Sequence, residues 1–305
     1  MEEGKKIVEV KNLVKFYGNF QALDNVNFDV FEGDIFGFLG PNGAGKSTTI
    51  RTILSLIKPT SGTINIFGKS LEKNRNFILS KTGCIVEKPD FYKYLSAEKN
   101  LELFARISGK SLNKSDIHEL IDFVGLKGRE RDKLSGFSHG MKQRLGIAQT
   151  LINDPDLIIL DEPTTGLDPQ GIIDIRNLIL QLKNERNKTV ILSSHILSEI
   201  ELIANRMIII NKGKTLIEGS VSELLNSQEL IVAFTVDKPD LAKKILLEHN
   251  LWDTANSQIE TQLFLHAQEN DIPTINNLFC TNEIQVFSIE KKRKLEDYFL
   301  KLIAS

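Results

Sequence analysis

The 305-residue sequence has little cysteine, little excess charge and no long apolar run. Its two cysteines, Cys84 and Cys280, lie far apart and without metal-ligand spacing, which is typical of a protein from a reducing compartment. Because free cysteine is among the most frequently buried residue types, we expect both thiols to lie in apolar cores. No segment approaches the roughly 18 apolar residues that a membrane-spanning helix needs.

The charge balance and the N-terminal segment bear on the expected partners and cellular location of the protein. The 38 Lys and Arg residues nearly balance the 40 Asp and Glu residues, and the net charge of -2 gives no reason to expect a nucleic-acid partner. The opening "MEEGKKIVEV" lacks the apolar core of a secretory signal. We therefore expect a soluble, cytoplasmic chain that reaches a membrane only through a partner.

The pattern of apolar residues predicts an α/β protein with a smaller second domain. Buried strands alternate with helical patterns up to about residue 220, as in a parallel sheet covered by helices. A helical insert interrupts them at about residues 88–152. The rest predicts a small α+β domain of the split βαβ kind, with one strand at "IETQLFLHA" and a closing helix at "KLEDYFLKLIA". We expect domains at 1–225 and 226–305.

The segment "GPNGAGKST" matches the phosphate-loop pattern GxxxxGK[ST] between a predicted strand and a predicted helix. Glycines let successive backbone N–H groups surround phosphate oxygens, and the helix N-terminus adds partial positive charge. The alternative is a plain glycine-rich turn. We expect Lys46 to contact the β- and γ-phosphates and Ser47 to bind Mg²⁺ within an ATP site formed by Gly40, Pro41, Asn42, Gly43, Ala44, Gly45, Lys46, Ser47 and Thr48.

The segment "LIILDEPTTGLDP" supplies carboxylates for the same site. Four apolar residues predict a buried strand whose carboxyl end carries Asp161 and Glu162 to the phosphate loop. We expect Asp161 to hold Mg²⁺, directly or through water. We expect Glu162 to orient and activate the attacking water, because transfer of a γ-phosphoryl group requires a positioned nucleophile.

The segment "ILSSH" ends a third predicted strand at His195. A histidine taken at random is more often structural or solvated than catalytic. His195 differs because it follows a strand, as Asp161 does, and so comes to the same sheet edge. An imidazole at this edge can reach the γ-phosphate and fix Glu162 and the water relative to it.

The order of these motifs, with "FSHGMKQR" between them, resembles the ATP-binding subunit of ABC transporters over about the first 220 residues. The resemblance implies a P-loop NTPase (RecA-like) core with an antiparallel β subdomain and a helical insert, followed by a ferredoxin-like domain. It also implies a signature loop at "FSHGM" that binds nucleotide through Ser138 and Gly140. Phe137, His139 and Met141 depart from the usual Leu-Ser-Gly-Gly-Gln, and a simple helix cap is the alternative.

The resemblance further implies a head-to-tail dimer, with itself or with a paralogous ATPase, that encloses two ATP molecules. Asp168 resembles the residue that passes information between the two sites, although capping of the next helix is a compatible alternative. Tyr17, in "VKFYGNFQAL", matches the aromatic residue that stacks on adenine, although a tyrosine at a strand end can be mere surface or core.

We expect the partner to be a separate transmembrane permease subunit. "EKPDFY" and "SSHILSEIE" are similar to segments of bacterial multidrug, bacitracin-resistance and lantibiotic-immunity exporters, which favours export. Glu87 replaces the glutamine usual at that point, and we expect it to contact Mg²⁺ or to be an exposed strand-end carboxylate. A soluble, non-transport ABC ATPase and an ATP-dependent regulatory module are the alternatives.

Overall fold

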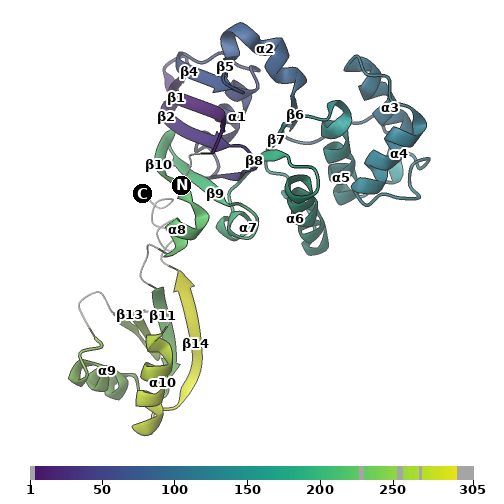
Figure 1. Cartoon of the computed structure of the whole chain (residues 1–305). Helices are drawn as coiled ribbons and strands as arrows, with labels where there is room; N and C mark the ends of the chain where they lie inside the picture. Colours follow the sequence, from purple (N-terminus) through teal and green to yellow (C-terminus); the bar gives the residue numbers. More distant parts are fainter. Residues whose placement is uncertain (1–3, 227–229, 253–256, 268–269, 294–305) are drawn as a thin grey trace. The chain divides into compact units, whose positions relative to one another are not determined.

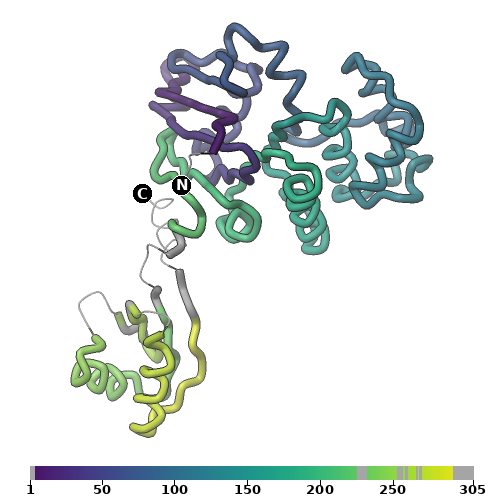
Figure 2. The backbone as a smooth tube through the Cα atoms, viewed as in Figure 1, coloured from purple at the N-terminus to yellow at the C-terminus, as the bar shows by residue number. Residues whose placement is uncertain are grey.

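Two units with separate hydrophobic cores make up the chain, Met1–Ser220 and Val221–Ser305 (Figure 1). The computed structural model describes residues 4–226, 230–252, 257–267 and 270–293, and Figure 2 follows the backbone through both units. The predicted closing helix at 294–304 lies outside the described residues.

A six-stranded sheet positions the candidate site. Five neighbouring strands are parallel, namely β9, β3, β8, β7 and β6, and only β10 runs antiparallel to its neighbour β9. Every residue of β3, β7 and β8 is buried, as expected for central strands covered on both faces. Their carboxyl ends therefore meet at one sheet edge. The order is β10 (Lys214–Ser220), β9 (Arg206–Asn211), β3 (Ile35–Leu39), β8 (Thr189–Ser194), β7 (Leu157–Leu160) and β6 (Thr82–Ile85).

A four-stranded antiparallel sheet forms the β subdomain that the resemblance implies. Its order is β2 (Phe20–Phe31), β1 (Lys6–Tyr17), β4 (Ser61–Ile66) and β5 (Lys69–Ser70). Phe28 of this sheet contacts two residues of β3, with ring centroids 4.8 Å from Phe38 and 5.7 Å from Phe36. Because all three rings are buried, they join the two sheets through one hydrophobic core.

The helical insert is confirmed, and its helices α3, α4 and α5 pack together (Figure 1). Ser96 caps α3 and Asn113 forms a capping box with Asp116 at α4, so local sequence fixes where these helices begin. Helix α2, between β5 and β6 in sequence, has no counterpart among the predicted elements. The helices of the first unit are α1 (Lys46–Ile53), α2 (Leu71–Ser80), α3 (Ala97–Ile107), α4 (Lys114–Phe123), α5 (His139–Thr150), α6 (Pro169–Asn184) and α7 (Leu197–Glu201), with 3-10 turns at Leu134–Gly136 and Leu151–Asn153.

The second unit is an α+β domain, and one of its predicted strands is a hairpin. Because Glu260 has a left-handed backbone (φ +50°), the chain turns inside "IETQLFLHA" and makes two strands of the expected one. The strand order β12-β13-β11-β14, all antiparallel, is compatible with the expected ferredoxin-like arrangement. The elements are α8 (Val221–Asn226), β11 (Leu230–Val236), α9 (Pro239–Glu248), β12 (Ser257–Ile259), β13 (Gln262–Ala267), α10 (Asp271–Thr281) and β14 (Val286–Arg293).

The expectation of two buried thiols is wrong, because both cysteines are exposed. Cys84 lies on β6, an edge strand whose neighbouring residues Gly83 and Ile85 are buried instead. Cys280 follows the buried Phe279 on α10, and one residue along a helix turns the side chain away from the core.

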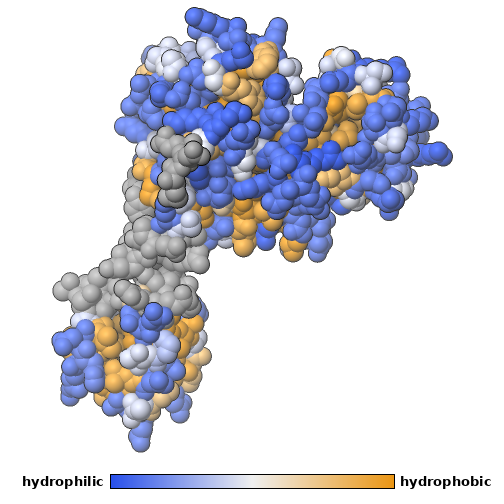
Figure 3. All heavy atoms as spheres, in the orientation of Figure 1, coloured by the Kyte–Doolittle hydropathy of each residue, from blue (hydrophilic) through white to orange (hydrophobic). Residues whose placement is uncertain are grey.

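The surface agrees with the absence of long apolar segments in the sequence. Figure 3 shows hydrophobic side chains as scattered patches among hydrophilic ones on the face in view. Among the described residues, no helix is both long enough and apolar enough to cross a membrane.

Candidate functional site

The segment "GPNGAGKST" forms a tight loop between the end of β3 and the start of α1. A side chain at Gly40 would collide with the backbone oxygen of Ile210 on β9, so this position excludes every other residue. Gly45 has φ +108°, a conformation that side chains rarely adopt, and it caps α1. The two glycines let the loop close over the sheet edge and point the first turn of α1 at whatever binds there.

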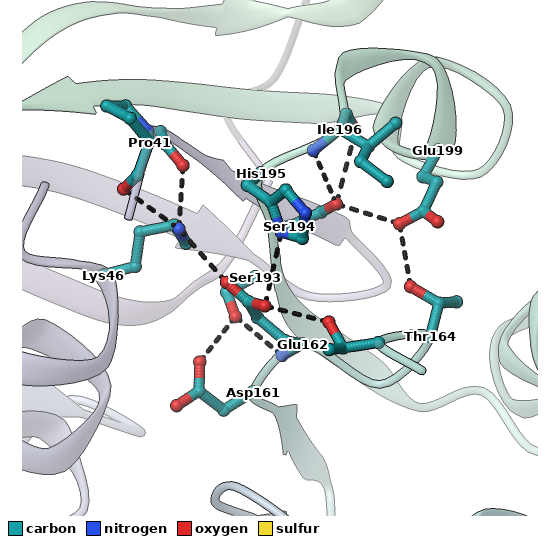
Figure 4. Close-up of polar contacts among 12 residues, drawn as sticks. Pro41, Lys46, Asp161, Glu162, Thr164, Ser193, Ser194, His195, Ile196 and Glu199 are labelled. Atoms are coloured by element: carbon teal, nitrogen blue, oxygen red, sulfur yellow. Dashed lines mark hydrogen bonds and ion pairs between the residues drawn. The ribbon is translucent and has the colours of Figure 1, made fainter. Parts of the chain in front are cut away.

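Lys46 is almost fully buried, with 4% of its side chain exposed. Its buried ammonium group is compensated by three oxygen atoms. Its Nζ donates to the backbone oxygens of Gly40, at 2.7 Å, and Pro41, at 3.2 Å. The same Nζ lies 3.2 Å from Oε1 of Glu162 (Figure 4). The structure therefore places the predicted phosphate-binding lysine against the predicted catalytic carboxylate.

Glu162 is held in an uncommon backbone conformation, with φ +47°. Its backbone N–H donates to Oγ of Ser193 at 2.8 Å, and its Oε2 accepts a 2.9 Å hydrogen bond from Oγ1 of Thr165. Partial burial by itself would raise the pKa of Glu162, but the Thr165 hydrogen bond and the charge of Lys46 lower it overall. The carboxylate is thus ionised at neutral pH and can accept a hydrogen bond from water.

Asp161 and His195 complete the cluster from two neighbouring strands. Ser193, at the end of β8, donates from Oγ to Oδ1 of the buried Asp161 at 2.6 Å. Nδ1 of His195 lies 3.3 Å from Oε2 of Glu162, although without hydrogen-bond geometry. The ends of β3, β7 and β8 therefore bring Lys46, Asp161, Glu162 and His195 together, as parallel strands should.

A cavity of about 250 Å³ runs from the phosphate loop to an exposed aromatic pair. Tyr17 lies there as predicted, with 45% exposure, and Nζ of Lys15 sits 4.9 Å from its ring centroid. Phe20 also lines the cavity and was missed. It is opposite Tyr17 across a two-residue turn in "YGNF", a hairpin signal readable from the sequence. The lining residues are Tyr17, Phe20, Ala22, Pro41, Asn42, Gly43, Gly45, Lys46, Ser47, Thr48 and Glu162.

The oxygen atoms near the loop suit magnesium. Among the described residues there is no group of three or more His, Cys, Asp or Glu side chains able to hold a metal. Mg²⁺ differs from most metals because it commonly takes one or two protein ligands and fills its shell with phosphate oxygens and water. The Ser47 hydroxyl, in the first turn of α1, and the Asp161 carboxylate are hard donors of this kind.

Glu87 does not line the cavity at the phosphate loop (the phosphate cavity). Its carboxylate pairs with the guanidinium of Arg51 on α1, and its backbone is left-handed at φ +66°. It lines a second cavity between the loop after β6 and the start of α5, together with Pro89, His139 and other residues. It does not line the cavity that Ser47 lines, so its contact with Mg²⁺ stays a prediction.

The signature and interface residues act as helix caps within this chain. Ser138 is the N-cap of α5, and its Oγ accepts a 3.2 Å hydrogen bond from the backbone N–H of Met141 in the first turn. Asp168 is the N-cap of α6, and its Oδ1 accepts a 3.0 Å hydrogen bond from the backbone N–H of Gly171. Neither residue lines the phosphate cavity, nor does Gly140. One chain alone does not bring them to its own phosphate loop.

Sequence reasoning missed the hydroxyl residues that support the cluster. Ser193 and Ser194 stand in "ILSSH", where the pattern predicts only a strand that leads to His195. Thr165 and Glu199 carry no predicted role. Two of their hydrogen bonds, from Glu162 to Ser193 and from Thr164 to Glu199, join residues 31 and 35 positions apart, and no local pattern signals such contacts.

Comparisons with known proteins agree with this geometry. The profile of the ABC transporter family matches residues 23–165. A bacitracin transport ATP-binding protein of Bacillus licheniformis is 43% identical over 97% of this chain and 97% of its own length. A lantibiotic transport ATP-binding protein of Streptococcus pyogenes is 42% identical over 73% of this chain and 95% of its own length.

Solved structures give the same result for the fold. An ATP-binding cassette whose dimer was solved in a post-hydrolysis state with ADP and Pi is 28% identical, with a TM-score of 0.63 over 70% of this chain and 99% of its own. With its phosphate loop, strand-end carboxylates and full-length relatives, the chain belongs to the ATP-binding subunits of ABC transporters and is an ATPase.

Proposed function

We propose that the chain binds MgATP, dimerises around it and hydrolyses it to drive a separate transmembrane permease subunit. The proposed transport is export of an antibiotic peptide, a drug or a similar compound. The full-length bacitracin transport relative and the lantibiotic transport relative support this substrate class. The chain would then work at the cytoplasmic face of the membrane, held there by its permease, without a nucleic-acid partner.

The contact of Lys46 and His195 with one carboxylate, that of Glu162, carries the proposal (Figure 4). A γ-phosphate above the loop would draw the Lys46 ammonium toward its oxygens. Glu162 would then be free to accept a proton from, and orient, an in-line water. His195, at the end of β8, would contact the γ-phosphate and keep that water aligned.

The remaining site residues would each bind a different part of MgATP. Tyr17 would stack on the adenine, and the N–H groups from Gly40 to Thr48 would hold the phosphates. Ser47 and Asp161 would hold Mg²⁺, which when bound neutralises negative charge on the β- and γ-phosphates.

Dimerisation would complete each site from the partner. Ser138 and Gly140 stand at the start of α5, where the backbone N–H groups of a helix attract anions. A second copy, or a paralogous ATPase, would present these residues to ATP held by the first chain. Asp168 would lie between the two sites and report the state of one to the other. The dimeric cassette with ADP and Pi supports the dimerisation itself.

The variant Glu162→Gln tests the proposed hydrolysis. Removing the carboxylate should lower ATP turnover at least about a hundredfold, since a general base commonly contributes that much. ATP binding should remain, and the variant should accumulate as an ATP-bound dimer on size-exclusion chromatography in MgATP. Lys46→Ala should abolish the dimer as well as the turnover.

Glu185→Gln, which neutralises an exposed carboxylate at the end of α6, is the matched control and should behave as the parent chain does. Normal turnover by Glu162→Gln would show that the catalytic base has been assigned to the wrong residue.

Glu87 is proposed to couple nucleotide to the permease. MgATP would draw its carboxylate from Arg51, and the loop from Pro89 to Tyr92 would move with it. Tyr92 and Tyr94 are exposed and stack edge to face, so they suit a groove contact with a helix of the permease. Glu87→Gln should keep most ATP hydrolysis while reducing transport per ATP in vesicles that contain both subunits. Unchanged transport would rule out this role.

A further inference from the structure

The carboxylate of Glu199 joins the two segments that carry the catalytic residues (Figure 4). Glu199 lies on α7, four residues after His195. Its Oε2 accepts a 2.8 Å hydrogen bond from Oγ1 of Thr164 and a 2.9 Å hydrogen bond from Oγ of Ser194. One oxygen atom therefore connects the turn after β7 to the end of β8.

Both hydroxyl donors lie close in sequence to a catalytic residue, Ser194 next to His195 and Thr164 two residues after Glu162. Ser194 immediately precedes His195, and its Oγ also accepts from the N–H of Ile196 at 3.0 Å, so both neighbours of the histidine are fixed. Thr164 precedes Thr165, whose hydroxyl donates to the Glu162 carboxylate. Displacing the Glu199 carboxylate would therefore disturb both sides of the contact between Glu162 and His195.

The same turn leads to the proposed dimer interface. The backbone N–H of Leu167 donates to the oxygen of Thr164 at 3.2 Å, and Asp168 follows directly. A movement at Asp168 would reach Thr164 through one hydrogen-bonded turn. From Thr164 it would reach Ser194 through the shared oxygen of Glu199.

The strength of the two hydrogen bonds to Glu199 favours a structural effect on the site over a weak contact at the surface. Glu199 is half-buried and Ser194 is 3% exposed, so water competes poorly for the two hydrogen bonds. Hydrogen bonds to a charged group are about twice as strong as neutral ones. The left-handed backbone of Glu162 is a costly conformation that persists only where surrounding contacts hold it.

We propose that Glu199 is a positioning residue that sets the distance between Glu162 and His195 and links both to the interface turn at Asp168. The proposal rests on the proposed function, because it takes Glu162 as the base and His195 as its partner at the γ-phosphate. Glu199 itself need not touch ATP.

The test measures ATP hydrolysis, ATP binding and thermal unfolding for the full-length chain. Glu199→Ala should lower kcat about ten- to a hundredfold, the range expected when a catalytic group is misplaced by about 1 Å. ATP affinity and KM should change less than about threefold. Glu199→Gln should restore much of the lost kcat, because its amide oxygen can still accept both hydrogen bonds. Ser198→Ala, an exposed neighbour on α7, is the matched control.

Non-additivity separates positioning from general destabilisation. Thr164→Val and Ser194→Ala should each lower kcat, and adding Thr164→Val to Glu199→Ala should cost nothing further, because the same hydrogen bond has already been lost. These two variants and Glu199→Gln test the proposal even if Glu199→Ala fails to fold.

Several outcomes would overturn the inference: an unchanged kcat in Glu199→Ala, a rise in KM alone, or fully additive losses. Glu162→Gln is measured in parallel. If that variant keeps its turnover, the proposed function fails; if it is inactive while Glu199→Ala is fully active, only the role of Glu199 fails.

Discussion

Phe20 lines the same cavity as Tyr17 because it is the cross-strand partner of that residue. Directly opposed residues of an antiparallel pair point to the same face, so both rings line the phosphate cavity. Phe20 is 66% exposed and packs into no core, which leaves its ring available for the nucleobase or ribose.

Phe20→Ala should weaken ATP binding about fivefold, because an aromatic contact is worth about 1 kcal/mol. Inorganic tripolyphosphate, which has no base or ribose, should bind the variant and the parent chain equally. Isothermal titration calorimetry with both ligands measures the difference. Phe16→Ala is the matched control, since Phe16 is exposed on the opposite face of the same hairpin. Equal ATP affinities for Phe20→Ala and the parent would remove Phe20 from the site.

At the scale of elements, the phosphate loop depends on how closely β3 approaches β9. Gly40→Ala places a methyl group against the Ile210 oxygen and should destabilise the chain by about 1–3 kcal/mol, since the packed sheet edge cannot give way without strain. ATP affinity should fall with it. Denaturant unfolding and ATP titration measure the two effects.

Gly136→Ala provides the comparison, because Gly136 is exposed and an added Cβ meets nothing within 4 Å. Its unfolding free energy should match that of the parent chain. If Gly40→Ala has the same unfolding free energy and the same ATP affinity as Gly136→Ala, the loop does not need a glycine at position 40.

At the scale of the whole molecule, every predicted site residue lies in the first unit. The lantibiotic transport relative matches 73% of this chain yet is covered over 95% of its own length, so a related protein manages largely without a second unit. A chain ending at Asn226 should therefore unfold cooperatively and bind ATP within about threefold of the full-length affinity. Calorimetry and ATP titration check both. Aggregation or lost binding would show that the first unit needs the second in order to fold.

Local sequence was enough to predict which residues come to the carboxyl edge of the sheet and which strands carry them. A buried strand followed by Asp161 and Glu162, or by His195, has to deliver those side chains to the carboxyl edge of a parallel sheet, and the geometry of the sheet does the rest. The glycine and lysine spacing of the phosphate loop is equally local. The structure brings these side chains to one sheet edge as predicted, because their placement depends on residues adjacent in the chain.

Which side chains pair around that edge depends on the three-dimensional fold. The exposure of Cys84 follows from β6 being an edge strand, which depends on strand order. The ion pair between Glu87 and Arg51 and the bridge through Glu199 join segments that are distant in sequence. Hydrogen bonds and charges act over a few ångströms in space, and separation along the chain does not reveal which groups come that close.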